Sequence, residues 1–301
     1  MVFPNFKRNI LNISATIADY LGVPNEHAKL KSLQNELSKD YKNIIFICFD
    51  GLSNYTLKKN LKPNDFLRKH ISQTVTSTFP STTTCATTTL MTAQFPSEHG
   101  WFGWSLYFDK LDKVVSIFRD CDHYTKEPVE TDYAYKVLPY ISYFNKTESK
   151  YAETTVFYSK CKIVNVAKNH YPFDTLQEQF AIIDNVAKQE GKQFVYCYNH
   201  NPDALMHRDG INGKPAHEFI ESVNRHVQKF SKEHPDTLLI ITADHGHTEI
   251  TEHINVYEDT ALMPFLHCQP YGDARAMSLK VKPDQHRDLL LYNRKKIRQK
   301  G

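Results

Sequence analysis

Long apolar runs are missing from this sequence. No stretch of about 18 consecutive apolar residues occurs, so no membrane-spanning helix is predicted. The N-terminal segment, MVFPNFKRNILNISATIADYLG, lacks the continuous apolar stretch of a signal peptide. We therefore expect a cytoplasmic protein with no membrane segment.

A strong excess of one charge is also missing. The 37 lysine and arginine residues nearly balance the 34 aspartate and glutamate residues, which leaves a net charge of +3. Proteins dedicated to nucleic-acid binding usually carry a large basic excess. No nucleic-acid partner is therefore expected, and the basic segment from Asn293 to Gly301 is interpreted as solvated surface.

Paired cysteine motifs do not occur either. The six cysteines are far apart, and none forms a C-x-x-C pair. Cys48, Cys85 and Cys197 lie in segments that we expect to be buried. We interpret them as reduced core residues, as is usual for a cytosolic protein.

Neither internal repeats nor stretches rich in glycine or serine divide the chain. We therefore predict a single domain over residues 1–301, with its core at about 42–270. Residues 101–150 are aromatic and polar with weak periodicity. This segment is predicted to form a small cap or insertion that shapes substrate access.

Short apolar runs alternate with segments of helical periodicity. The runs Lys42–Phe49, Phe194–Tyr198 and Leu238–Thr242 are typical of buried strands. Apolar residues recur at helical spacing in Asp174–Glu190 and Ala216–Lys232. This order predicts an α/β fold in which helices cover both faces of a mostly parallel sheet.

An acidic residue follows each of the three predicted strands. These residues are Asp50, Asp203 and Asp244. Ligands of parallel sheets bind outside the carboxyl ends of the strands. Residues far apart in the sequence are therefore expected to meet at one edge of the sheet and to form a functional site there.

Histidines accompany two of these acidic residues. Asp244 precedes His245, and Asp203 lies four residues before His207, a spacing that puts both side chains on one face of a helix. Carboxylates and imidazoles are common metal ligands. Each pattern alone also fits a simpler role, because Asp50 or Asp244 can cap a helix. Asp203 and His207 can form a solvated helix face.

The threonine-rich stretch from Thr78 to Thr92 is the least ordinary feature. A hydroxyl at the junction of a loop and a helix can bind a metal ion, which lowers its pKa and activates it for attack on phosphorus. The N-terminus of the helix also favours the charge of a phosphate. The alternative is that Ser81 or a neighbouring threonine only caps the helix.

Together these motifs resemble the type I phosphodiesterase/nucleotide pyrophosphatase family of the alkaline phosphatase superfamily. The family's nucleophile region is similar to Thr78-Phe-Pro-Ser-Thr-Thr, Leu90-Met-Thr-Ala and Phe95-Pro-Ser-Glu-His-Gly. Its metal-binding motifs are similar to Phe49-Asp-Gly, to Asn201-Pro-Asp with His207, and to Thr242-Ala-Asp-His-Gly. The resemblance covers residues 42–248 with the motifs in the family's order, and it implies an alkaline-phosphatase-like fold.

The resemblance also implies a threonine nucleophile. In the family pattern the nucleophile lies nine residues before the threonine of a T-G pair, which corresponds to Thr83 when counted back from Thr92. Ala93 replaces the usual glycine of that pair. Thr82 is the fallback, and Thr78 fits if the T-F-P signature is followed instead.

Two divalent metal ions, usually Zn²⁺, are implied by the same analogy. The residues around the first ion would be Asp50, Thr83, Asp244 and His245. The second would be held by Asp203 and His207. The family takes a further ligand of this second ion from a late His-Gly motif, but no His-Gly pair follows Gly246. Three explanations stay open: a truncated chain, another group in that position, or a weak second site.

The implied activity is hydrolysis of a phosphodiester or nucleotide pyrophosphate, with a small phosphate ester or nucleotide as substrate. Thr83 would attack phosphorus in line, and water would then hydrolyse the phosphothreonine. Related folds cleave phosphomonoesters, phosphonates and sulfate esters, and the sequence does not choose among these substrates. Two other readings stay open: an inactive, metal-binding relative that acts as a binding module, and a metal-free α/β protein. No oligomeric state is predicted.

Overall fold

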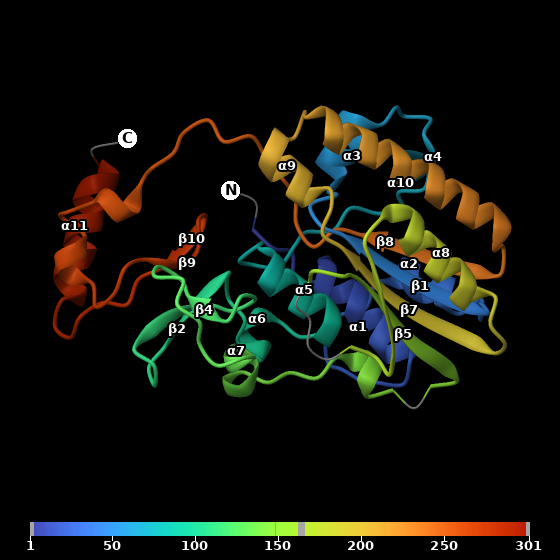
Figure 1. The fold of residues 1–301 in the computed structure, drawn as a ribbon, viewed down its shortest axis with the longest axis horizontal. Coiled ribbons are helices and arrows are strands. Elements are labelled where there is room, and N and C mark those ends of the chain that lie inside the picture. The colour runs from blue at the N-terminus through green and yellow to red at the C-terminus, as the bar shows by residue number, and fades with distance from the viewer. Residues whose placement is uncertain (1–2, 148, 162–165, 299–301) are drawn as a thin grey trace.

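A five-stranded parallel sheet forms the centre of the protein (Figure 1). The computed structural model describes residues 3–147, 149–161 and 166–298. The strand order is β6-β5-β7-β1-β8, and every neighbouring pair is parallel. The strands are β1 (Asn43–Phe49), β5 (Tyr151–Tyr158), β6 (Asn169–Phe173), β7 (Lys192–Asn199) and β8 (Thr237–Thr242). The predicted α/β fold with a parallel sheet is confirmed.

The central strand β1 is buried on both faces of the sheet. All seven of its residues are buried, and successive side chains of a strand point to opposite faces. Ile44, Phe46 and Cys48 belong to one core cluster. Ile45, Ile47 and Phe49 belong to another. Because a large apolar side chain contributes roughly 1.5–3 kcal/mol when fully buried, β1 anchors both layers of the core.

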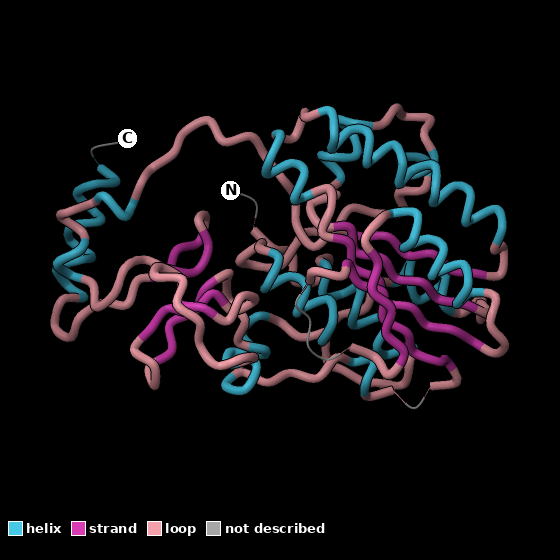
Figure 2. The backbone as a smooth tube through the Cα atoms, viewed as in Figure 1, coloured by secondary structure: helices cyan, strands magenta, loops and turns pink. Residues whose placement is uncertain are grey.

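Helices cover both faces, as expected, and Figure 2 shows them on either side of the strands. One face packs against α1 (Ile10–Tyr20), α2 (Lys31–Leu37) and α5 (Thr83–Thr92). The other face packs against α3 (Asn54–Asn60), α4 (Phe66–Lys69), α8 (Leu176–Ala187) and α10 (Lys214–Glu233). The helix α5 begins at the carboxyl edge of the sheet, where the functional site is predicted.

Two details of the sheet differ from the prediction. The strand β8 was expected to be buried, but its residues are only half-buried, because β8 lies at an edge and pairs with β1 alone. The strands β5 and β6 were not predicted, since their sequences mix polar and apolar residues. Four of the five residues of β6 are exposed, as befits the other edge.

The described residues of the segment 101–150 form a small antiparallel sheet and two short helices beside the main sheet. The strands are β2 (Ser105–Phe108), β3 (Lys113–Ser116) and β4 (Cys121–Asp122), followed by α7 (Tyr133–Val137) and the 3-10 helix η1 (Tyr143–Asn145). Trp101 is buried at the start of this segment, and its indole N–H donates to the Leu138 carbonyl. The substrate-access role expected for this segment stays a prediction.

The C-terminal part has a small core of its own. It contains η2 (Val256–Glu258), η3 (Met263–Phe265), β9 (Tyr271–Asp273), β10 (Ala276–Ser278) and α11 (His286–Arg298). Leu262, Leu266 and Leu289 form its buried cluster. The hairpin β9–β10 contacts β2, where the Gly272 N–H donates to Ser105 Oγ at 3.0 Å. None of the described helices combines the length and hydropathy of a membrane span.

Candidate functional site

Three acidic residues meet where the three central strands end. Asp50 follows β1 directly, Asp203 opens α9 (Asp203–Asp209) after β7, and Asp244 lies two residues beyond β8. These strands are adjacent and parallel, so their carboxyl ends lie at one edge of the sheet (Figure 1). Carboxylate oxygens of Asp50 and Asp203 lie within 4.8 Å of each other and of a His245 ring nitrogen. The strand ends therefore bring together residues that are remote in the sequence.

The Thr83 hydroxyl lies between Asp50 and His245. Thr83 is the first residue of α5. Its Oγ1 donates to Asp50 Oδ2 at 3.3 Å and lies 3.1 Å from His245 Nε2. The same Nε2 lies 3.3 Å from Asp50 Oδ1 and 3.5 Å from Asp244 Oδ2. The structure thus gathers the four residues that the resemblance placed around the first metal ion; we call them the first cluster.

The three candidate nucleophiles differ in position. Thr82 is the N-cap of α5, but its side chain makes no capping hydrogen bond, and its carbonyl accepts the Ala86 N–H. Thr78 is buried in the loop before the helix. Of the three threonines, Thr83 is the one whose hydroxyl is seen to contact Asp50. Side-chain capping therefore does not explain this helix start.

The acidic residues of the first cluster are likewise not helix caps. The cap of α3 is Ser53, whose Oγ accepts the Thr56 N–H. Asp244 Oδ1 instead accepts the N–H groups of Gly51 at 3.2 Å and of His245 at 2.8 Å. Asp244 thereby ties the end of β8 to the turn after β1.

A buried tyrosine orients Asp50. Tyr198, on β7, donates its hydroxyl hydrogen bond to Asp50 Oδ2 at 2.5 Å. Burial and the nearby charges of Asp244 and Asp203 raise the pKa of Asp50 well above its usual range, although the Tyr198 hydrogen bond opposes them. Sequence reasoning treated Tyr198 only as a strand residue. Its place near the end of a strand beside β1 was the available signal.

Gly51 allows the turn after β1 to approach α9 closely. Its φ is +71°, a left-handed conformation that glycine adopts easily. A Cβ at this position would lie 2.9 Å from Met206 Cε and 3.2 Å from Asp203 Cβ. The Asp203 N–H also donates to the Asp50 carbonyl at 3.0 Å. This contact sets Asp203 beside the first cluster.

A second cluster forms around Asp203. Asp203 and His207 share one face of α9, with His207 Nε2 3.4 Å from Asp203 Oδ2. His247 approaches from the segment after β8, and its Nε2 lies 2.8 Å from Asp203 Oδ1. The ligand atoms of all three lie within 4.8 Å of one another. The sequence interpretation left His247 without a role, because the family motif ends at Gly246; its position two residues after His245 was the signal.

The donor set fits divalent cations. Asp50 Oδ1 and Asp244 Oδ2 are buried and have no hydrogen-bond partner among the described residues. Burial lowers the pKa of the His245 imidazole, but the charges of Asp244 and Asp203 outweigh burial and raise that pKa. Buried carboxylates that repel one another need positive charge nearby, and carboxylate with imidazole suits zinc and similar ions. Asp203 belongs to both candidate groups of ligands, so it lies between two adjacent positions.

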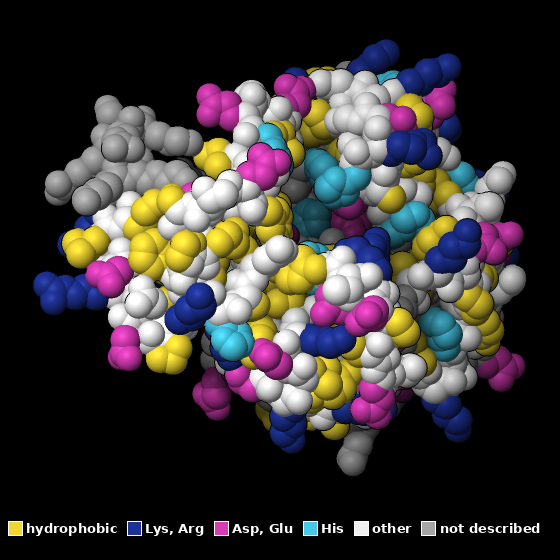
Figure 3. All heavy atoms as spheres, turned by 60° about the vertical axis from the view of Figure 1, so that its left-hand side comes forward, with side chains coloured by type: hydrophobic (Ala, Val, Ile, Leu, Met, Phe, Trp, Pro, Cys, Tyr) yellow, Lys and Arg dark blue, Asp and Glu magenta, His cyan; other side chains and the backbone are white. Residues whose placement is uncertain are grey.

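Figure 3 shows a hollow on this side of the molecule, with histidine side chains around it and acidic atoms at its base. The exposed fraction of the side chains increases from the base of the site to its rim. The Asp50 side chain is 3% exposed, His245 and Asp203 are slightly exposed, and His207 is 70% exposed. The site is therefore open to a ligand at His207 and closed toward the sheet.

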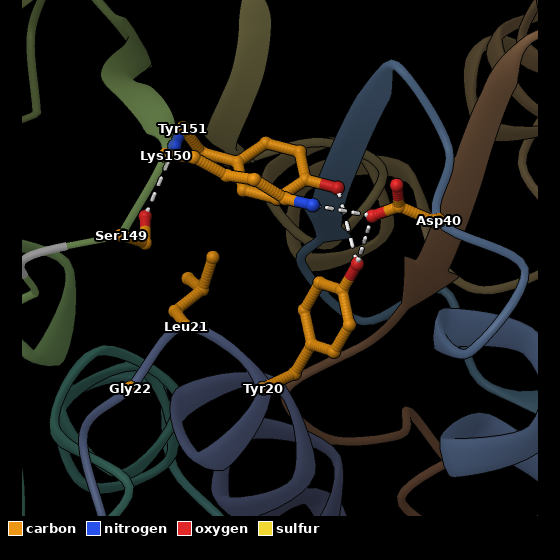
Figure 4. A pocket seen from close by; sticks show the side chains of 7 residues that line it. All are labelled: Tyr20, Leu21, Gly22, Asp40, Ser149, Lys150 and Tyr151. Atoms are coloured by element: carbon orange, nitrogen blue, oxygen red, sulfur yellow. Dashed lines mark hydrogen bonds and ion pairs between the residues drawn. The ribbon is translucent and has the colours of Figure 1, made fainter.

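A second depression, of about 350 Å³, lies at the opposite edge of the sheet (Figure 4). It is lined by Tyr20, Leu21, Gly22, Asp40, Ser149, Lys150 and Tyr151. Its polar groups pair with one another: Lys150 Nζ lies 2.7 Å from Asp40 Oδ1, and the Tyr20 and Tyr151 hydroxyls are 3.2 Å apart. We assign no ligand to this depression.

Comparisons with known proteins point to one family. The family model for type I phosphodiesterase/nucleotide pyrophosphatase matches residues 44–297. A search of curated proteins finds no match. Among solved structures, murine ectonucleotide pyrophosphatase/phosphodiesterase 5 is similar at a TM-score of 0.61 and 18% identity, covering 82% of this chain and 68% of that one. An inactive form of the murine protein in complex with AMP has a TM-score of 0.59, also at 18% identity and with the same coverage of both chains. The human protein has a TM-score of 0.58 at 17% identity, again with that coverage.

Proposed function

The chain belongs to the type I phosphodiesterase/nucleotide pyrophosphatase family, and from that premise we propose that it hydrolyses phosphodiester or nucleotide pyrophosphate bonds with Thr83 as the nucleophile. Membership makes it a phosphoester hydrolase of a metal-dependent family. The proposal adds the nucleophile, the number of metal ions, which is two, and their identity, which is Zn²⁺. The observation that supports it is the convergence of the Thr83 hydroxyl with Asp50, Asp244 and His245 at the sheet edge.

Asp50, Asp244 and His245 would hold one ion. Asp203 and His207, both on α9, would hold the second. Bound divalent cations would supply positive charge that lowers the pKa of a hydroxyl and stabilises negative charge on phosphate oxygens. The buried carboxylates of Asp50 and Asp244 fit this role, because one oxygen of each has no hydrogen-bond partner among the described residues. The first turn of α5 adds N–H groups that have no partner within the helix and favour a phosphate.

The protein's own groups place the nucleophile. Asp50 accepts the hydrogen bond of the Thr83 hydroxyl, and this fixes the direction in which Oγ1 points. Tyr198 in turn fixes Asp50. Oγ1 of Thr83 would form a bond to phosphorus while the bond to the leaving oxygen breaks. Water would then cleave the phosphothreonine and restore the hydroxyl.

A nucleotide is the substrate class that we propose first. The murine structure that shares this fold was solved in complex with AMP. The open side of the site, at the exposed His207, leaves room for the part of the substrate beyond the phosphate. Catalysis would depend chiefly on positioning and charge neutralisation.

The test is hydrolysis of a nitrophenyl phosphodiester and of a nucleotide pyrophosphate, with and without added Zn²⁺, on protein of measured metal content. We expect zinc-dependent turnover with close to two ions per chain. The Thr83→Ala variant should lose turnover by at least about 10³-fold. The Thr82→Ala variant is the matched control and should keep it.

Other results would contradict the proposal in different ways. Wild-type turnover by Thr83→Ala would exclude Thr83 as nucleophile, and its loss in Thr82→Ala alone would move the role by one residue. Two bound ions without turnover of either substrate would favour a binding module. Turnover of nitrophenyl phosphate alone would instead indicate a phosphomonoesterase.

A further inference from the structure

His247 lies where the second cluster needs another ligand. The sequence contains no His-Gly pair after Gly246, so the late histidine of the family pattern has no counterpart. Asp203 and His207 alone offer two ligands, whereas protein sites for zinc ordinarily use three or four. His247 supplies a third ligand from a different part of the chain.

The geometry of the second cluster is that of a site with three ligands. His247 Nε2 faces Asp203 Oδ1 at 2.8 Å, and His207 Nε2 faces Asp203 Oδ2 at 3.4 Å. The two imidazole rings are 4.6 Å apart with their planes at 78°. A zinc ion about 2.1 Å from each ligand of a tetrahedron sets these ligands about 3.4 Å apart. The three ligand atoms, all within 4.8 Å of one another, need only small side-chain movements to reach that arrangement.

The burial of the three side chains separates their roles. The His247 side chain is 16% exposed and that of Asp203 is 13% exposed, whereas that of His207 is 70% exposed. His247 is therefore the shielded imidazole of the cluster.

The backbone places His247 by a short connection from the first cluster. Gly246 separates it from His245, and a Cβ on Gly246 would lie 3.2 Å from both Cβ and Oγ of Ser53. This close approach holds the segment against the turn that follows β1. One segment of the chain thereby sends His245 to the first cluster and His247 to the second.

We propose that His247 is the third protein ligand of the second metal ion, together with Asp203 and His207, in place of a histidine from later in the chain. The inference rests on the proposed two-metal function, because it concerns the ligands of the second ion.

The experiment measures metal binding directly. Zinc binding to the full chain is titrated by calorimetry against a competing chelator for the wild type, His247→Ala and His253→Ala. His253 is exposed in the same connection and belongs to neither candidate ligand group, so it is the matched control. We expect two ions in the wild type and the control. His247→Ala should bind the second ion at least about tenfold more weakly, since even loss of a residue that only orients a ligand can cost that much.

A second variant separates a ligand from a merely structural residue. Cysteine can ligate the same ions, so His247→Cys loaded with Co²⁺ should bind two ions and show a sulfur-to-cobalt charge-transfer band that the wild type lacks. If His247→Ala fails to fold, the charge-transfer band of His247→Cys still shows whether the side chain at position 247 binds the metal ion. Unchanged binding of two ions by His247→Ala, or a folded His247→Cys without the band, would overturn the proposal.

These readouts keep the two proposals apart. A wild type that binds two ions through His247 but turns over no phosphoester leaves this inference standing and removes the proposed function. If the wild type turns over substrate and His247→Ala still binds two ions with full affinity, the proposed function stands and the assignment of His247 as a ligand is removed.

Discussion

Protonation of His99 should weaken the fold in mild acid. His99 is 4% exposed and lies beside α5, the helix that carries Thr83. The backbone N–H of Trp101 donates to His99 Nδ1 at 3.1 Å, and His99 Nε2 lies 3.1 Å from Thr89 Oγ1. In the neutral ring Nδ1 is therefore the acceptor and Nε2 carries the proton. A second proton on Nδ1 would face the Trp101 N–H and break that bond.

The magnitude follows from the difference in pKa between the folded and unfolded states. Burial lowers the pKa of His99 from 6.5 to about 4. The unfolded state therefore binds a proton between these pH values when the folded state does not, so the free energy of unfolding decreases as the pH falls through this window. At pH 5 the loss is about 2 kcal/mol, and below pH 4 it levels off at about 3 kcal/mol. Above pH 6.5 the ring is neutral in both states and contributes no pH dependence.

The assay is urea unfolding of the wild type and of His99→Gln at pH 7 and pH 5. Glutamine can donate to Thr89 and accept from Trp101, but it does not titrate. Other titrating groups affect both proteins alike, so they cancel in the comparison. The wild type should lose about 2 kcal/mol more than the variant between the two pH values. Equal losses, to within about 0.5 kcal/mol, would refute the assignment of His99 as a buried neutral acceptor.

Two further predictions concern residues that shape the first cluster. Tyr198→Phe should lower the free energy of unfolding by about 1–3 kcal/mol, because it removes the nearer of the two hydroxyl donors to the buried Asp50 Oδ2. Urea unfolding measures the change, and an unaltered midpoint would contradict the role given to this hydrogen bond. Gly51→Ala should cost more stability than Gly191→Ala. Both glycines have similar positive φ values, +71° and +76°, which cost an alanine about 1 kcal/mol. Only at Gly51 would the new Cβ meet neighbouring atoms, those of Met206 and Asp203, so equal thermal midpoints for the two variants would show that the close approach carries no energy.

Much of the fold could be predicted because local signals agreed with the final structure. The apolar run that became β1 is buried on both faces, and the helical spacing of apolar residues marked α8 and α10. The position of β8 was not readable, since an apolar strand at an edge has the same sequence character as one in the middle. β8 is half-buried because it pairs with one strand only, and its place at the edge is set by the order of strands in the whole sheet.

Some residues of the site could likewise be predicted from the sequence, and others could not. Asp50, Asp203 and Asp244 could be proposed because strand ends of a parallel sheet meet at one edge. Tyr198 and His247 could not, because their roles depend on which side chains lie opposite them. Tyr198 on β7 reaches Asp50 at the end of the neighbouring strand β1, and His247 reaches Asp203 from a segment with no regular structure. Their only sequence signals were the nearness of Tyr198 to a strand end and of His247 to His245, and neither signal names the partner side chain.

The order of strands in the sheet also has a consequence for synthesis of the protein on the ribosome. β1 is the first strand of the sheet to be translated, yet it pairs on both sides with strands made much later, β7 and β8. The contact between Gly51 and Asp244 spans 193 residues, which take about 10–40 s to translate. For most of that time β1, which is buried along its whole length in the folded protein and apolar except for Asn43, has neither of its partner strands. We expect α1 and α5, which are translated early and pack on one face of β1, or chaperones, to cover this strand until the sheet can close.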